Sequence, residues 1–90
     1  MIQIISYDIS DDKLRNKFSK ILSRNGAVRL QYSVYEINSS NRVYDNLIVK
    51  IDSFSKQISG GDSILIFNVN KSEIKKYGNA IHRDRDIFYF

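Results

Sequence analysis

The chain has 90 residues, with 14 lysines and arginines against 10 acidic residues, and it has no cysteine. Its length fits one small domain, because a chain this short buries only about two-thirds of its unfolded surface. The missing cysteine excludes disulfides, thiolate metal sites and a cysteine nucleophile. Neither a basic leader nor a run near the roughly 20 apolar residues of a membrane span is found, so we expect a cytoplasmic protein without a membrane partner.

The first predicted element is a strand over residues 2–7 with apolar side chains on both faces. Ile2 and Ile4 point one way, and Ile5 and Tyr7 point the other way. Asp8 ends this strand, and Asp11 and Asp12 follow it. A carboxylate in this place is either a reaction-centre residue on a rigid strand or a cap of the next turn. The strand pattern alone leaves both interpretations open.

An amphipathic helix is predicted next, with Asp11 or Asp12 as its N-cap and Gly26 as its stop. Its apolar residues, spaced as on one helix face, are Leu14, Phe18, Ile21 and Leu22. Beside them a stripe about 60° wide holds four cations: Lys13, Lys17, Lys20 and Arg24. Like charges in one stripe repel each other, so an anion such as nucleic-acid phosphate would explain them. A solvated surface is the plain alternative.

Residues 28–37 alternate between apolar and polar side chains, as in a strand with one wet face. The predicted faces are Val28, Leu30, Tyr32 and Val34 against Arg29, Gln31, Ser33 and Tyr35. The stretch is either one strand or a hairpin.

The second half of the chain predicts another helix, two strands and a short turn. The helix begins at caps within residues 39–41 and ends at Gly60-Gly61. A strand apolar on both faces covers residues 62–69, a helical turn covers 72–77, and "DIFYF" forms a final strand over 86–90.

This order predicts an α+β domain of ferredoxin-like type, βαββαβ plus a C-terminal strand, with both helices on one face of an antiparallel sheet. Helices cover one face only, yet the strands at 2–7 and 64–69 are apolar on both. A second copy of the chain is the simplest cover, so we expect a two-fold homodimer.

Three motifs in order resemble the small CRISPR-associated adaptation protein family, the second core subunit of the spacer-integration complex. They are "SYDISDDKLRNKFSKIL", then "LQYSVYE", then "GDSILIFNV". The resemblance reaches from Met1 to about Val69. One departure is Tyr35, where the family usually has phenylalanine, and the aromatic ring is kept.

The resemblance implies a homodimer that bridges two dimers of the larger CRISPR integrase subunit on double-stranded DNA. It also implies a metal-dependent endonuclease acting on RNA or DNA, with Asp8 as catalytic residue and metal ligand. Mg²⁺ (or Mn²⁺) is the expected ion, and since it commonly takes one or two protein carboxylates, the two-fold mate of Asp8 would be the second ligand. The expected nucleic-acid-binding residues are Lys13, Arg15, Lys17, Lys20 and Arg24.

We expect one domain over residues 1–90, in which residues 71–90 form a C-terminal extension that pairs with the partner chain. A toxin-like metal-dependent endoribonuclease acting alone is the main alternative, and an RNA-binding module is a weaker one. Arg15 lies off the basic stripe, so an ion pair with an acid near Asp8 is an alternative to DNA contact. His82, the only histidine, is interpreted as a surface side chain.

Overall fold

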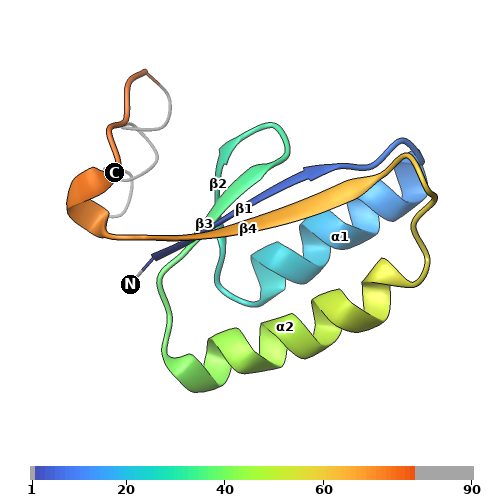
Figure 1. The fold of residues 1–90 in the computed structure, drawn as a ribbon, viewed down its shortest axis with the longest axis horizontal. Coiled ribbons are helices and arrows are strands. Elements are labelled where there is room, and N and C mark those ends of the chain that lie inside the picture. Colours follow the sequence, from blue (N-terminus) through green and yellow to red (C-terminus); the bar gives the residue numbers. More distant parts are fainter. Residues whose placement is uncertain (1, 79–90) are drawn as a thin grey trace.

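The computed structural model describes residues 2–78; the predicted strand at 86–90 and His82 lie outside them. The elements in order are β1 (Ile2–Asp8), α1 (Asp12–Arg24), β2 (Val28–Gln31), β3 (Val34–Ile37), α2 (Asn41–Ser55), β4 (Ser63–Val69) and the 3-10 turn η1 (Lys71–Glu73). The strands form one antiparallel sheet in the order β2-β3-β1-β4. Both helices lie on one side of this sheet (Figure 1), which confirms the predicted α+β arrangement of two helices and four strands.

Helix α1 has the predicted bounds because both of its ends are specified locally. At its start, the Asp11 carboxylate accepts the backbone N–H of Leu14 at 2.9 Å, as an N-cap does. At its end, Gly26 adopts a φ of +90°, a left-handed conformation that other residues rarely take. The helix buries Phe18 and Leu22 completely.

Residues 28–37 form a hairpin, which decides between the two sequence interpretations. The strands β2 and β3 pair through a turn at Tyr32 and Ser33, and Ser33 has a φ of 69°. The turn interrupts the alternation, so the predicted faces were wrong for Tyr35, which is buried, and for Tyr32, which is 66% exposed. Tyr35 is 2% exposed and its ring stacks 6.2 Å from that of Tyr7.

Helix α2 begins as predicted, with the Ser40 hydroxyl accepting the N–H of Val43. It ends at Ser55, so the predicted end at Gly60-Gly61 was wrong. The N–H of Ser59 instead donates to the Asp62 carboxylate at 3.0 Å, which stabilises a turn in place of further helix. The helical turn predicted at 72–77 is likewise shorter and earlier, as η1.

The core lies between the sheet and the two helices, where aromatic rings meet. Phe18 is fully buried, with its ring 4.9 Å from that of Tyr7 and 5.0 Å from that of Phe54. Ile5 and Leu47 complete the centre of this cluster and are also fully buried. Among residues 2–78, no helix is both long and apolar enough to span a membrane.

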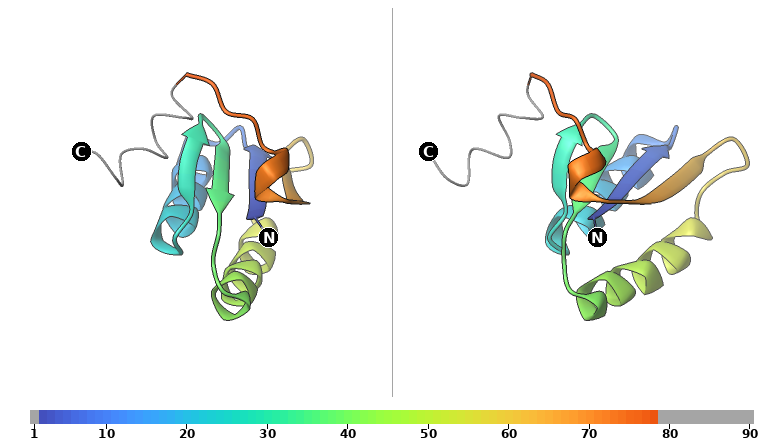
Figure 2. Two further views of the ribbon diagram at one scale, coloured as in Figure 1. Left: turned by 90° about the vertical axis from the view of Figure 1, so that its left-hand side faces the viewer. Right: turned by 60° about the vertical axis from the view of Figure 1, so that its left-hand side comes forward.

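Within residues 2–78, neither α1 nor α2 lies over the opposite face of the sheet (Figure 2). Leu65 and Phe67 of β4 are 53% and 49% exposed there. After η1 the chain turns back, and the Lys76 ammonium lies 2.7 Å from a carboxylate oxygen of Glu36 on β3. This open face is therefore apolar along β4 and carries an ion pair at β3.

Candidate nucleic-acid site

Asp8 is the last residue of β1, a strand with neighbours on both sides. It pairs with Ser63 of β4, while the N–H of Tyr7 donates to the carbonyl of Ser33 at 3.1 Å. The Asp8 side chain is exposed. Over residues 2–78, it makes no side-chain hydrogen bond or ion pair. A rigid strand end thus presents a carboxylate to solvent.

The loop after Asp8 is anchored to the start of α1 by Arg15. The Arg15 guanidinium donates to the carbonyl of Ile9 at 3.0 Å and forms an ion pair with Asp12. The Asp12 carboxylate is the main cause that raises the pKa of Arg15. Arg15 therefore has the alternative arrangement considered from the sequence, bound to an acid close to Asp8 and away from the basic stripe.

Asp62, just before β4, anchors the same loop from the neighbouring strand. Its carboxylate accepts the N–H and the hydroxyl of Ser10, at 3.0 and 3.1 Å, and the N–H of Ser59 at 3.0 Å. These hydrogen bonds lower the pKa of Asp62, and the one from the Ser10 N–H has the largest effect. Sequence reasoning missed this role because Ser10 and Asp62 lie 52 positions apart. The one local signal in the sequence was that Asp62 directly follows Gly60-Gly61.

The four aspartates around this strand end therefore have different surroundings. Asp11 caps α1, Asp12 binds Arg15 and Asp62 joins two loops. Within the part of the chain that the structure describes, no three histidines, cysteines or carboxylates cluster as a ready metal site. One chain thus offers the Asp8 carboxylate as one ligand, which suits an ion that takes its other ligands from water, phosphate or a second copy.

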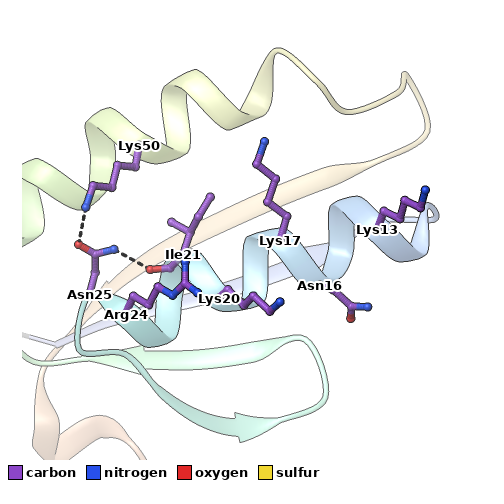
Figure 3. A pocket seen from close by; sticks show the side chains of 8 residues that line it. All are labelled: Lys13, Asn16, Lys17, Lys20, Ile21, Arg24, Asn25 and Lys50. Atoms are coloured by element: carbon purple, nitrogen blue, oxygen red, sulfur yellow. Dashed lines mark hydrogen bonds between the residues drawn. The ribbon is translucent and has the colours of Figure 1, made fainter.

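The basic stripe of α1 lines a groove of about 530 Å³ (Figure 3). Its lining residues are Lys13, Asn16, Lys17, Lys20, Ile21, Arg24, Asn25 and, from α2, Lys50. Lys17 donates to the amide oxygen of Gln57 at 3.2 Å, and Lys50 donates to that of Asn25 at 3.1 Å. Among residues 2–78 the ion pairs are Arg15–Asp12 and Lys76–Glu36, so the five groove cations have no carboxylate partner there.

The predicted nucleic-acid residues thus fall into two groups. Lys13, Lys17, Lys20 and Arg24 share the groove, whereas Arg15 lies at the loop that follows Asp8. Lys50 joins the first group and was missed, because it lies on the other helix and the sequence shows no pattern linking the two. The groove and the strand end are therefore separate features of the molecule.

Solved structures share this fold. The chain matches the crystal structure of hypothetical protein TT1823 from Thermus thermophilus with a TM-score of 0.68 and 27% identity, over 86% of this chain and 89% of that one. It also matches Streptococcus pyogenes Cas2, crystallised at pH 6.5, with a TM-score of 0.65 and 20% identity, over 87% of this chain and 100% of that one. The class is thus that of small α+β proteins with the Cas2 fold.

The family follows from the sequence. The family model described as CRISPR associated protein Cas2 matches residues 1–77, which is most of the chain. The chain belongs to the Cas2 family, and the resemblance that its motifs indicate is confirmed.

Two curated relatives match part of the chain. It is 41% identical to CRISPR-associated endoribonuclease Cas2 1 of Archaeoglobus fulgidus over 44 residues, 47% of each protein. It is 53% identical to CRISPR-associated endoribonuclease Cas2 2 of Methanospirillum hungatei over 34 residues, 38% of this chain and 37% of that protein. The chain spans less than half the length of these two relatives. The endoribonuclease activity in their names is therefore stated of those two proteins.

Proposed function

We propose that this protein works in CRISPR adaptation, as a ferredoxin-like two-fold homodimer that bridges the larger integrase subunits on double-stranded DNA. We further propose that it has metal-dependent endonuclease activity on RNA or DNA at Asp8. Membership of the Cas2 family over residues 1–77 is the observation that carries the proposal. The exposed Asp8 carboxylate, held at the end of an interior strand, is the feature that fits it chemically.

Support for the dimer comes from the open face of the sheet. Leu65 and Phe67 each leave about half of their surface exposed in one chain. They sit opposite Ser6 and Ile4 of β1 in the register, so four side chains of one face are contiguous. Apolar surface of this kind on a sheet is a common site of association, and two-fold symmetry is its usual form.

Support for DNA bridging comes from the groove. Its cations extend along α1 from Lys13 to Arg24, about 16 Å at the rise of an α-helix. A row of this length matches roughly five phosphates of one strand along a duplex axis. Contacts with phosphate do not read sequence, so we expect binding that falls steeply with salt and is indifferent to sequence.

The chemistry at Asp8 would need a divalent ion, Mg²⁺ (or Mn²⁺), with Asp8 of each protomer as a ligand. Such an ion, when bound, supplies an oriented or activated water and neutralises charge on the scissile phosphate. The contribution of the chain itself is to hold the Asp8 carboxylate in a fixed position. Arg15 and Asp62 fix the loop that follows Asp8, and β3 and β4 fix the strand before it.

A toxin-like, metal-dependent endoribonuclease acting alone is the second candidate. The names of the two curated relatives favour ribonuclease activity. The two candidates share the site at Asp8 and differ in whether cutting is the biological role.

Replacing Asp8 by asparagine tests both, because it removes the charge and keeps the shape. We expect Asp8→Asn to lose metal-dependent cleavage of RNA and DNA and to leave spacer acquisition in cells at the wild-type level. Asp45→Asn on α2, another exposed aspartate, is the matched control and should change neither. Cleavage that survives Asp8→Asn would contradict the site, and acquisition lost with cleavage would contradict a mainly bridging role.

A further inference from the structure

Tyr32 is an exposed aromatic residue beside the strand end that carries Asp8. It lies in the turn between β2 and β3 and is 66% exposed. The turn is fixed against β1, because the N–H of Tyr7 donates to the carbonyl of Ser33 at 3.1 Å. Along the chain, Tyr32 directly precedes Ser33 and Asp8 directly follows Tyr7. The two side chains therefore come from adjacent ends of paired strands.

One arginine lies over this ring, and the pKa of a second one responds to Tyr32. The guanidinium carbon of Arg29 lies 5.3 Å from the centroid of the Tyr32 ring. On the α1 side, Asp12 is the main group that raises the pKa of Arg15, and the Tyr32 hydroxyl acts in the same direction. Arg15 in turn donates to the carbonyl of Ile9, the residue after Asp8. The ring, Arg29 and Asp8 thus lie at the same end of the sheet.

Tyr32 contributes little to the core, in contrast to its neighbour Tyr35. Tyr35 is 2% exposed and stacks with Tyr7, whereas Tyr32 lies outside the buried cluster. Exposed tyrosines are common and carry no meaning singly. The position of this one, with Arg29 over its ring and an exposed carboxylate on the adjacent strand end, is the feature that needs an explanation.

We propose that Tyr32 is a stacking platform for one unpaired nucleobase of a single-stranded nucleic acid, with Arg29 placed to contact the adjoining phosphate. Aromatic rings in cationic surroundings bind single strands without reading sequence, since every base has a flat face. A paired base in a duplex is already stacked and does not reach a ring on a turn. The proposal rests on the proposed nuclease function and adds a base-binding residue beside Asp8.

The groove of α1 and this platform would therefore take different ligands. The groove offers a straight row of cations and one apolar lining residue, Ile21, which suits a duplex backbone. The platform offers a ring and a cation, which suits a base and its phosphate. Substitutions at one site should leave binding at the other unchanged.

The test is the affinity of the full chain for a short fluorescein-labelled single-stranded RNA, measured by anisotropy in EDTA. Tyr32→Ala should weaken binding about 5- to 150-fold, the range that follows from losing one base stack, while Tyr32→Phe should stay near wild type. Tyr77→Ala removes another exposed tyrosine, 78% exposed, and should have no effect.

The salt dependence separates stacking from charge. Tyr32→Ala should leave the slope of log Kd against log salt concentration unchanged, because no phosphate contact is lost. Arg29→Gln should reduce that slope by about 0.7, the value for one phosphate contact on a single strand. Affinity for duplex DNA should be unaffected by Tyr32→Ala.

Binding by Tyr32→Ala within twofold of wild type would overturn the proposal, as would an equal loss in Tyr32→Phe. If the wild-type chain cleaves nothing and Tyr32→Ala still binds weakly, the nuclease function fails and the platform stands. If Asp8→Asn abolishes cleavage while Tyr32→Ala binds normally, the platform fails and the nuclease function stands. A second measurement, with an abasic residue in the RNA, needs no variant and should weaken wild-type binding when it replaces the stacked base.

Discussion

The two faces of the sheet use similar residues in opposite ways. On the helix side, Phe18 is fully buried between Tyr7 and Phe54. On the open side, Phe67 is 49% exposed, and its neighbour Leu65 is 53% exposed. The same type of side chain therefore stabilises the fold on one face and is left half exposed on the other. The comparison separates what one chain needs to fold from what a second copy is proposed to complete.

The largest effect is expected from removing the open-face residues together, in Leu65→Ser with Phe67→Ser. Half-burial of both side chains in each of two protomers contributes about 3–6 kcal/mol to association. The dimer dissociation constant should rise about 150- to 20,000-fold. Light scattering during size exclusion measures it, with Val49→Ser, an exposed apolar residue on α2, as control. A wild-type chain that is monomeric at high concentration would contradict the proposed dimer.

The next effect concerns the helix side. Phe18→Ala should cost about 3–5 kcal/mol of unfolding free energy, as large-to-small changes in a packed aromatic core do. Phe67→Ala is the matched substitution on the open face and should cost less than half as much in the monomer. Urea denaturation at low protein concentration compares the two. Equal costs would show that the open face is also part of the core of one chain.

The smallest effect on stability is expected from the loops at the Asp8 end of the sheet. The donors from Ser10 and Ser59 hold the pKa of Asp62 below its ordinary value of 3.8. A lowered pKa in the folded state contributes stability above that ordinary value, and the contribution is lost as the pH falls through the folded pKa. Asp62→Asn should therefore lower the urea midpoint near neutral pH and converge with wild type in acid. A gap that persists unchanged in acid would contradict this account, and Asp45→Asn should show no gap.

Elements with local signals were predictable from the sequence, and those set by distant contacts were not. Helix α1 was predicted closely because Asp11 and Gly26 mark its ends chemically. The β2–β3 turn was left open because Tyr32 is not a typical turn residue and Ser33 adopts a φ of 69°, which residues other than glycine rarely take. Helix α2 was predicted too long because the turn after Ser55 depends on Asp62, which follows it in the chain.

The candidate site divides in the same way. The position of Asp8 at a strand end and the basic stripe of α1 follow from periodicity, and the structure has both arrangements. The anchors of the Asp8 loop, Arg15 and Asp62, depend on contacts that no spacing reveals. Lys50 reaches the groove only because α2 packs beside α1.

The most direct test of the central claim is affinity purification of the full-length wild-type chain from the cell in which it is native. We expect the larger CRISPR integrase subunit to copurify with it, and to be lost or depleted when Leu65→Ser and Phe67→Ser are introduced together. Recovery of the wild-type chain without any larger integrase subunit would contradict the bridging function.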